Sequence, residues 1–256
     1  MLAFGSVGEA MALKERVREL PKKADDGQMV KMVIVGCVYS GVKLAFNIRG
    51  SFSGLVEVVL VEMDDSILRR SAPWSKRVGQ RVLVEGGVIT EYKAQLKKVI
   101  ADEVAIQRKG SEEEVILKAD VVVMTAGTGK NEVLEGLEVA KDEKGRVQVD
   151  ELLQVLESDG TLFAQGDCAA VRGPGGEYGG TAQVAMQQTE YAARNLWAGL
   201  RGKAQLECKY SHLGGMMLLG SSTALLATPF GLNLDGKLAH AIRRAAHSIR
   251  MPTSSK

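Results

Sequence analysis

Residues 162 to 168 combine an apolar run with a glycine and a carboxylate, a pattern able to hold a bulky ligand. The stretch is Leu-Phe-Ala-Gln-Gly-Asp-Cys. Glycine lets the backbone approach a ligand closely, and a carboxylate at the carboxyl end of a parallel strand can accept a hydrogen bond from a sugar or ribityl hydroxyl. The pattern predicts flavin contact through Gly166 and Asp167, at the end of a strand over 161–165. An ordinary strand followed by a Gly-Asp turn without a ligand would have the same sequence pattern and is the alternative.

A glycine turn earlier in the chain is typical of nucleotide binding. Gly36 to Gly41 follows a β-branched run and opens a helix, as in a dinucleotide fingerprint, with Val38 in place of the middle glycine. The next strand ends at Glu62, where a carboxylate can hold a ribose 2′-hydroxyl. These features predict an NAD(P)H site. Glu62 favours NADH, whereas Arg69 and Arg70 could bind the 2′-phosphate of NADPH.

The elements expected to position these motifs alternate between strand and helix. A strand at 29–35, a helix at 42–49 and a buried strand at 56–61 form one βαβ unit, which requires a parallel sheet with helices on its faces. Further helices are expected at 9–20, 75–85, 181–200 and 236–250, and further strands at 88–92, 97–100, 103–108, 114–118, 119–125 and 161–165. A polar linker at 21–28, a hairpin turn at 144–145 with a short helix after it, and hairpins within 206–235 complete the pattern, so the fold class is α/β.

Composition restricts the classes of function. The 256 residues are 45% hydrophobic and carry a net charge of +2, which gives no bias toward nucleic acid. Three widely spaced cysteines without a Cys-x-x-Cys pair argue against a disulfide framework or a redox dithiol, and the histidines have no partners at metal-ligand spacing. No metal site and no leader peptide are predicted.

Two stretches raise the question of a membrane. The uncharged run from Leu213 to Leu234 is broken by glycines and polar residues into pieces of strand length, so it is not expected to span a bilayer. The closing helix from Gly236 to Arg250 is basic and amphipathic, which favours either an anionic membrane surface or docking on the domain with its cations in water. Its cations are Lys237, His240, Arg243, Arg244, His247 and Arg250.

A phosphate loop is not predicted at 127–130, although the letters Gly-Thr-Gly-Lys suggest one. Met124 stands where that motif needs its first glycine, and Asn131 stands where it needs serine or threonine. The segment is expected to be a turn at the end of a strand.

Four motifs together resemble a known family of two-dinucleotide-domain flavoproteins, the type II NAD(P)H dehydrogenases. They are Val-Ile-Val-Gly-x-x-Tyr-Ser-Gly-Val-x-Leu-Ala at 33–45, Thr-Ala-Gly-Thr at 125–128, Phe-Ala-Gln-Gly-Asp at 163–167 and Ala-Gln-Val-Ala-Met-Gln-Gln at 182–188. Leu-Gly-x-Met-Met-x-Leu-Gly at 213–220 and Ile-Arg-Met-Pro-Thr at 249–253 resemble the chloroplast C-type alternative branch of plants and algae, the demethylphylloquinone reductases. The resemblance covers about residues 10 to 253.

The resemblance implies roles for particular residues. It implies hydride transfer from NAD(P)H to FAD and then reduction of a prenylquinone, with Gln187 and Gln188 as the catalytic residues lining the quinone site. Asp167 would hold the ribityl chain of FAD. The residues implied to bind the cofactors are Gly36, Ser40, Gly41, Glu62, Gly127, Gly166, Asp167, Gln183 and Val184.

The resemblance also implies a domain plan, with a Rossmann-like NAD(P)H domain at 29–125 inserted in an incomplete FAD domain. Residues 1–28 would be a remnant of the FAD domain, 126–200 its second half, and 201–256 a small α+β segment on the membrane and quinone side. The family's own FAD fingerprint does not occur upstream of Met29, and Lys43 and Gly215 stand where the family has glutamate. The chain is therefore expected to be a truncated gene model or a degenerate paralogue.

The leading hypothesis is an FAD-dependent NAD(P)H:quinone oxidoreductase, peripheral to a chloroplast membrane (thylakoid or plastoglobule) or, alternatively, in the mitochondrion. Both a monomer and a homodimer stay open. One alternative is a non-catalytic, membrane-associated nucleotide-binding module. Another is a disulfide reductase branch of the flavoproteins, which the absence of a cysteine pair weakens.

Overall fold

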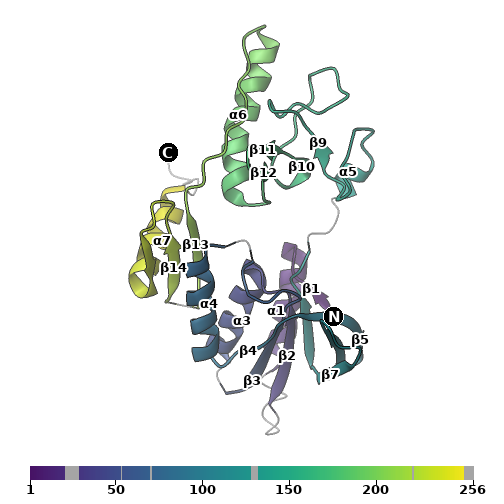
Figure 1. Ribbon diagram of the computed structural model, residues 1–256, viewed down its shortest axis with the longest axis vertical. Coiled ribbons are helices and arrows are strands. Elements are labelled where there is room, and N and C mark those ends of the chain that lie inside the picture. Colours follow the sequence, from purple (N-terminus) through teal and green to yellow (C-terminus); the bar gives the residue numbers. More distant parts are fainter. Residues whose placement is uncertain (21–28, 53, 70, 128–131, 221, 251–256) are drawn as a thin grey trace. The chain divides into compact units, whose positions relative to one another are not determined.

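The computed structural model describes residues 1–20, 29–52, 54–69, 71–127, 132–220 and 222–250 (Figure 1). Two compact units divide the chain: unit 1 comprises Met1–Gly127 and Gly214–Lys256, and unit 2 comprises Thr128–Leu213. Unit 1 is thus built from two separate stretches of sequence. The predicted linker at 21–28 lies outside the described residues.

A five-stranded sheet with all neighbours parallel forms the centre of unit 1. Its order is β1 (Leu2–Ala3), β8 (Val121–Met124), β2 (Val30–Val35), β3 (Val56–Val61) and β4 (Ile89–Glu91). Because β2 lies between β8 and β3, the carboxyl ends of these three strands meet at one edge of the sheet. The predicted βαβ unit and parallel sheet are confirmed.

The two faces of this sheet have different covers. Met32 and Ile34 face a core formed with helices α1 (Val7–Arg18), α3 (Tyr39–Ser51) and α4 (Pro73–Glu85). Val33 and Val35 face the antiparallel meander β5 (Ala94–Ile100), β6 (Glu103–Arg108) and β7 (Glu114–Lys118), which lies on the other side of the sheet in Figure 1. Among the described residues, helices therefore cover one face only, and the expectation of helices on both faces is wrong, because the short strands after α4 form the second layer.

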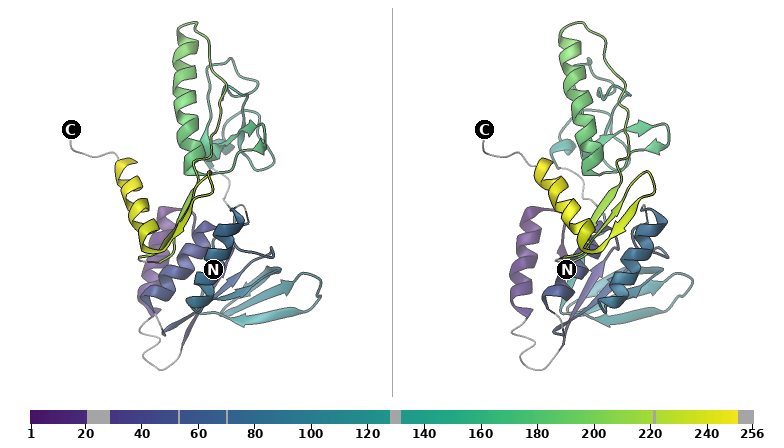
Figure 2. Two further views of the ribbon diagram at one scale, coloured as in Figure 1. Left: turned by 60° about the vertical axis from the view of Figure 1, so that its left-hand side comes forward. Right: turned by 90° about the vertical axis from the view of Figure 1, so that its left-hand side faces the viewer.

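The last part of the chain forms a second, smaller sheet in unit 1. Its strands are β13 (Gly215–Leu218), β14 (Ala224–Ala227) and β15 (Asn233–Asp235), all antiparallel, followed by α7 (Gly236–Arg250). Leu225 joins the core with α3 and α4, whereas Leu226 packs with Ala239 of α7, which lies along this sheet in Figure 2. The hairpins and the closing helix are confirmed, and none of the described helices is long and apolar enough to cross a membrane.

Unit 2 is built on one long helix, α6 (Ala182–Leu200), with little regular strand. Its short elements are α5 (Glu132–Glu135), β9 (Val147–Gln148), the 3₁₀ turn η1 (Gly166–Cys168), β10 (Ala169–Ala170), β11 (Arg172–Gly173) and β12 (Gly176–Glu177). The predicted hairpin turn at 144–145 is present, because Lys141 and Val147 form an antiparallel bridge. The short helix expected after that turn is wrong: α5 precedes it, and 151–152 form a turn.

The strand predicted at 161–165 is also wrong. Among residues 161–165, all of which the structure describes, only Phe163 forms a bridge, an isolated antiparallel one with Gln154. A strand needs a neighbour along its edge to form a ladder of hydrogen bonds. The apolar run is therefore an extended segment that leads into the 3₁₀ turn.

An extended segment at 203–213 follows α6 and is bound to it by amide side chains. The fully buried Asn195 donates to the carbonyl oxygens of Leu152 (2.9 Å) and Leu206 (2.7 Å), and its Oδ1 accepts the Leu206 N–H (2.8 Å). The Gln187 amide pairs with both the N–H and the carbonyl oxygen of Ser211. These bonds satisfy main-chain groups that have no strand partner.

The two compact units have other boundaries than the predicted domains, and the assignment of those domains to FAD and NAD(P)H binding stays a prediction. The opening helix, expected as a remnant of the FAD domain, packs into the core of unit 1 through Leu13. The segment expected to begin at residue 201 is divided at Leu213, because the strands that follow belong to unit 1.

Replacing Asn195 by alanine should destabilise unit 2. The change removes the Asn195 partner of two carbonyl oxygens and one N–H and empties a buried site, so we expect a loss of roughly 2–4 kcal/mol in the free energy of unfolding. Urea unfolding followed by circular dichroism measures it. The matched control is Asn47→Ala on the exposed side of α3, which should change stability little; equal effects of the two substitutions would contradict a bonding role for Asn195.

An ion-pair cluster in unit 2 should make stability depend on pH. Arg146 contacts Asp142 (2.5 Å) and Glu177 (2.6 Å). The hydrogen bond from Arg146 lowers the pKa of the Glu177 carboxyl below its usual range. A depressed folded-state pKa stabilises the fold above the unfolded value, about 4.3 for glutamate. That contribution is lost as the pH falls through the folded value.

Wild-type protein should therefore be more stable than Glu177→Gln at neutral pH, and this advantage should shrink as the pH falls below the ordinary glutamate pKa of about 4.3. Thermal unfolding over that range measures the difference. Glu190→Gln, on an exposed position of α6, is the control and should show no such trend. A constant difference between wild type and Glu177→Gln would refute the charge-based account.

Candidate functional site

The glycine turn lies at the carboxyl end of β2, in the middle of the parallel sheet. Gly36 has a φ of +101°, and a Cβ added there would lie 2.7 Å from the Cβ of Ala126. Its N–H donates to the carbonyl oxygen of Val61 at 2.8 Å. Both the left-handed backbone and the lack of space require glycine at this position.

Gly41 allows the first helical turn of α3 to pack closely against the glycine turn at Gly36. An added Cβ would overlap the carbonyl oxygen of Gly36 and lie 2.6 Å from the Thr125 hydroxyl. The buried Thr125 donates to the carbonyl oxygens of Val35 (3.0 Å) and Gly36 (2.8 Å). Thr125 thus fixes the turn from the neighbouring strand, a role that its position at the end of a buried apolar run does not reveal.

The Glu62 carboxylate lies beside the same turn. It accepts the N–H of Cys37 at 2.7 Å and the N–H of Asp64 at 3.1 Å. Burial, with the Glu62 charge, raises the pKa of the Cys37 thiol well above its usual range, so this thiol stays protonated at neutral pH. The site therefore presents one carboxylate and no thiolate.

The amino end of α3 has no side-chain cap. Val38 occupies the cap position without a side-chain hydrogen bond and is 45% exposed, and Ser40 is half-buried in the first turn. Unpaired N–H groups and the helix dipole make such an end attractive to anions.

Other residues proposed for this site differ in how they are placed. Gly127 follows β8 with a φ of +84°, and no atom lies within 4 Å of a Cβ added there. Arg69 lies 3.4 Å from Asp64, whereas Arg70 and the turn at 128–131 lie outside the described residues. The turn therefore gathers Gly36, Ser40, Gly41 and Glu62, all of them predicted from the sequence.

The second group of predicted residues lies in unit 2, around the start of α6. Gly166 has a φ of +64°, and its N–H donates to Oε1 of the buried Gln188 at 2.7 Å. Asp167 is exposed, and Gly180 leaves room for its carboxylate, since an added Cβ would lie 2.9 Å from Oδ1. The Gly-Asp turn is thus held by α6 with its carboxylate in solvent.

The first turn of α6 also binds the main chain around it. Thr181 caps the helix and accepts the Val184 N–H at 3.2 Å. Gln183 Oε1 accepts the Leu213 N–H at 3.0 Å and the Tyr210 hydroxyl at 3.2 Å. Gln183 and Val184 therefore begin a helix whose first turn is tied to the extended segment.

Gln187 and Gln188, predicted as catalytic, both have main-chain partners in the structure. Gln187 pairs with Ser211 at 2.8 and 2.9 Å, and Gln188 holds the Gly166 turn. These bonds make the two residues positioning groups. Contact of either amide with a substrate stays a prediction.

One polar pair near this helix was missed by the sequence analysis. The Tyr210 hydroxyl lies 2.9 Å from Nδ1 of His212, and the Tyr210 ring meets Tyr178 edge to face at 5.4 Å between centroids. His212 was expected to have no partner at metal-ligand spacing, and its bond to Tyr210 was not predicted, because a hydrogen bond between residues two apart on an extended segment has no pattern in sequence. No set of three or more metal-ligating side chains lies together among the described residues.

Substituting Gly41 by alanine should disrupt the turn between β2 and α3. The new methyl group collides with the main chain at Gly36, so α3 must shift away from the sheet. We expect a lower unfolding temperature, measured by thermal unfolding, and loss of dinucleotide binding, measured by NADH titration. Gly50→Ala, in the same helix with nothing within 4 Å of the new methyl group, is the control and should be neutral or stabilising by up to about 1 kcal/mol. Normal NADH affinity in Gly41→Ala would be incompatible with this packing.

Comparison with known proteins supports the resemblance based on sequence motifs. The model of the family described as "Pyridine nucleotide-disulphide oxidoreductase" matches residues 6–189. Demethylphylloquinone reductase NdbB of Synechocystis sp. is 31% identical over 253 residues, covering 98% of this chain and 61% of that protein. The alternative NAD(P)H-ubiquinone oxidoreductase C1 of Arabidopsis thaliana is 29% identical, covering 98% of this chain and 51% of the relative.

The fold of this chain also matches that of proteins whose structures have been solved. NDH2 from Plasmodium falciparum, in complex with NADH, superposes with a TM-score of 0.84 at 11% identity, covering 98% of this chain and 70% of that one. The chain spans between half and about three fifths of the length of the two curated relatives. With a family model matched over most of its length, a dinucleotide-type glycine turn and an α/β fold with a parallel sheet, the chain belongs to the pyridine nucleotide-disulphide oxidoreductase family.

Proposed function

We propose that this chain is the NAD(P)H-binding part and a portion of the flavin-binding part of an FAD-dependent NAD(P)H:quinone oxidoreductase. The observation that carries the proposal is the turn from Gly36 to Gly41, fixed by Thr125 and flanked by Glu62 at the carboxyl edge of a parallel sheet. The similarity to quinone reductases over 98% of the chain supports the choice of reaction.

The turn fits the pyrophosphate and ribose of NAD(P)H. Gly36 and Gly41 keep the turn free of side chains that would separate α3 from β2, and the uncapped helix end offers N–H groups to a phosphate. Glu62, with one oxygen on Cys37 N–H and the other on Asp64 N–H, is oriented by the main chain at the position where a ribose diol would be bound. The bound nucleotide would be NADH or NADPH.

Unit 2 fits part of the flavin. A left-handed Gly166 turn packed on Ala185 lets main chain approach a ring system, and the exposed Asp167 carboxylate is free to accept ribityl hydroxyls. When bound, a flavin accepts a hydride equivalent and passes two electrons to an acceptor; the protein supplies binding and orientation. Gly166, Asp167, Gln183 and Val184 are the residues proposed to do this here.

The proposed acceptor is a prenylquinone bound beside the first turns of α6. Gln187 and Gln188 fix the Ser211 segment and the Gly166 turn, so they would shape the wall of such a site. A substitution at either residue would then act through the position of main chain.

We further propose that α7 holds the protein on the surface of a plastid or mitochondrial membrane. Leu238, Ile242 and Ile249 recur at helical spacing on α7 and are exposed, at 62%, 36% and 84%. Cationic side chains flank this apolar stripe, which is the pattern of a helix lying in the membrane interface. Phe230, in the hairpin just before α7, is 94% exposed and would add to the same surface.

Reconstitution with FAD tests the proposal. The purified full chain, supplied with FAD, should retain yellow flavin after gel filtration; NADH should bleach it without oxygen, and a water-soluble quinone should restore the colour. Asp167→Asn should weaken flavin retention about tenfold through loss of a charged acceptor while leaving NADH affinity unchanged.

Asp65→Asn, an exposed position in unit 1, is the matched control and should behave as wild type. Protein that binds NADH yet stays colourless at high FAD would exclude flavin catalysis by this chain alone. Equal flavin retention in Asp167→Asn and wild type would exclude the assigned role of Asp167.

A further inference from the structure

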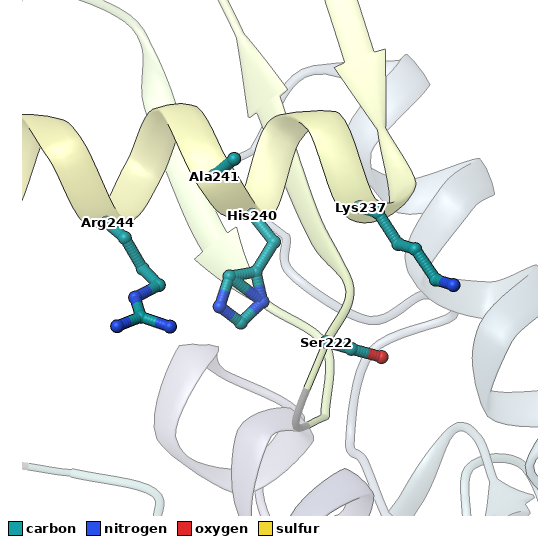
Figure 3. A pocket seen from close by; sticks show the side chains of 5 residues that line it. All are labelled: Ser222, Lys237, His240, Ala241 and Arg244. Atoms are coloured by element: carbon teal, nitrogen blue, oxygen red, sulfur yellow. The ribbon is translucent and has the colours of Figure 1, made fainter.

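A hollow beside α7 has no role in the proposed electron transfer. It has a volume of about 480 Å³ and is lined by Ser222, Lys237, His240, Ala241 and Arg244 (Figure 3). Figure 3 shows the His240 and Arg244 side chains leaving the same side of α7, with Ser222 on the facing loop. The hollow is open to solvent, so a ligand can enter it.

Three of the lining residues are basic and recur along one side of the helix. Lys237, His240 and Arg244 stand at spacings of three and four, which places them on adjacent turns of one face. Among the described side chains, no carboxylate forms an ion pair with any of the three. Asp235, the acidic residue that precedes α7, is instead bound to Arg81.

One lining residue carries a nitrogen without a partner. His240 Nδ1 is buried and has no hydrogen-bond partner among the described residues; Arg243 Nε, on the same helix but outside the lining of the hollow, is also buried without one. Burying a polar nitrogen without a partner is unfavourable, and gathering unpaired cations around it adds repulsion. An anion in the hollow would relieve the repulsion between Lys237 and Arg244 and offer an acceptor to the part of the His240 ring that lines the hollow.

We propose that this hollow binds one phosphate group. A phosphate has several oxygens at tetrahedral angles, so it can accept from an ammonium, an imidazole N–H, a guanidinium and the Ser222 hydroxyl at once, whereas a carboxylate presents two oxygens in one plane. The phosphate belongs either to free inorganic phosphate or to the headgroup of an anionic phospholipid. This site is independent of the proposed quinone chemistry, because its residues lie outside the dinucleotide and flavin turns.

Titration of the full chain with inorganic phosphate at constant ionic strength, followed by calorimetry and by the imidazole NMR signals, tests the site. Phosphate should bind the wild type and shift the His240 signals. Lys237→Gln, His240→Gln and Arg244→Gln should each weaken binding, by about tenfold for Arg244→Gln. Arg201→Gln, an exposed arginine in unit 2, and His247→Gln, on α7 outside the hollow, are the controls and should bind as wild type.

Vesicles distinguish the two sources. If the ligand is a headgroup, wild-type protein should prefer phosphatidylglycerol vesicles over phosphatidylcholine vesicles, and Arg244→Gln should lose most of that preference while Arg201→Gln keeps it. If the ligand is free phosphate, the titration succeeds and Arg244→Gln leaves vesicle binding unchanged. Circular dichroism verifies that each variant is folded. The proposal is overturned if folded variants at 237, 240 and 244 match the wild type in both assays.

Discussion

The close contact between the first turn of α3 and the end of β2 is the constraint on which unit 1 depends. Gly41 packs so closely that an added Cβ would overlap the carbonyl oxygen of Gly36, and Thr125, directly after β8, donates to that same oxygen. Three elements therefore meet at one main-chain atom. This contact fixes the direction of α3, the place of its uncapped end and the distance to Glu62, so the nucleotide-type geometry follows from packing around a single carbonyl group.

Elements whose signal is local could be predicted from the sequence. The strands at 56–61, 103–108 and 114–118 and the helix at 236–250 have the predicted bounds, because apolar periodicity and flanking glycines define them without distant partners. The stretch at 161–165 could not be predicted in this way. Its apolar letters suit a strand, but whether a strand forms depends on a neighbouring edge, which no local pattern contains.

In the candidate site, too, roles that depend on local backbone geometry could be predicted, and roles that depend on distant partners could not. Backbone-dependent positions such as Gly36, Gly41 and Gly166 were predictable, because a left-handed or crowded turn admits few residue types. The structural roles of Gln187 and Gln188 could not be predicted. Neighbours in the sequence, they point to partners 24 residues later and 22 residues earlier, Ser211 and Gly166. Amide side chains suit a ligand and a main-chain segment equally well, so only the tertiary structure assigns them.

The two-part composition of unit 1 has a consequence for synthesis on the ribosome. The core that includes α3 and α4 is closed by Met217 and Leu225, which the ribosome adds only after the whole of unit 2. Until then the nascent chain carries an apolar helix surface without its cover, the condition in which growing chains stick to one another or recruit chaperones. Because the chain is synthesised from its amino end, the time that the ribosome needs to synthesise unit 2 determines how long that helix surface stays uncovered.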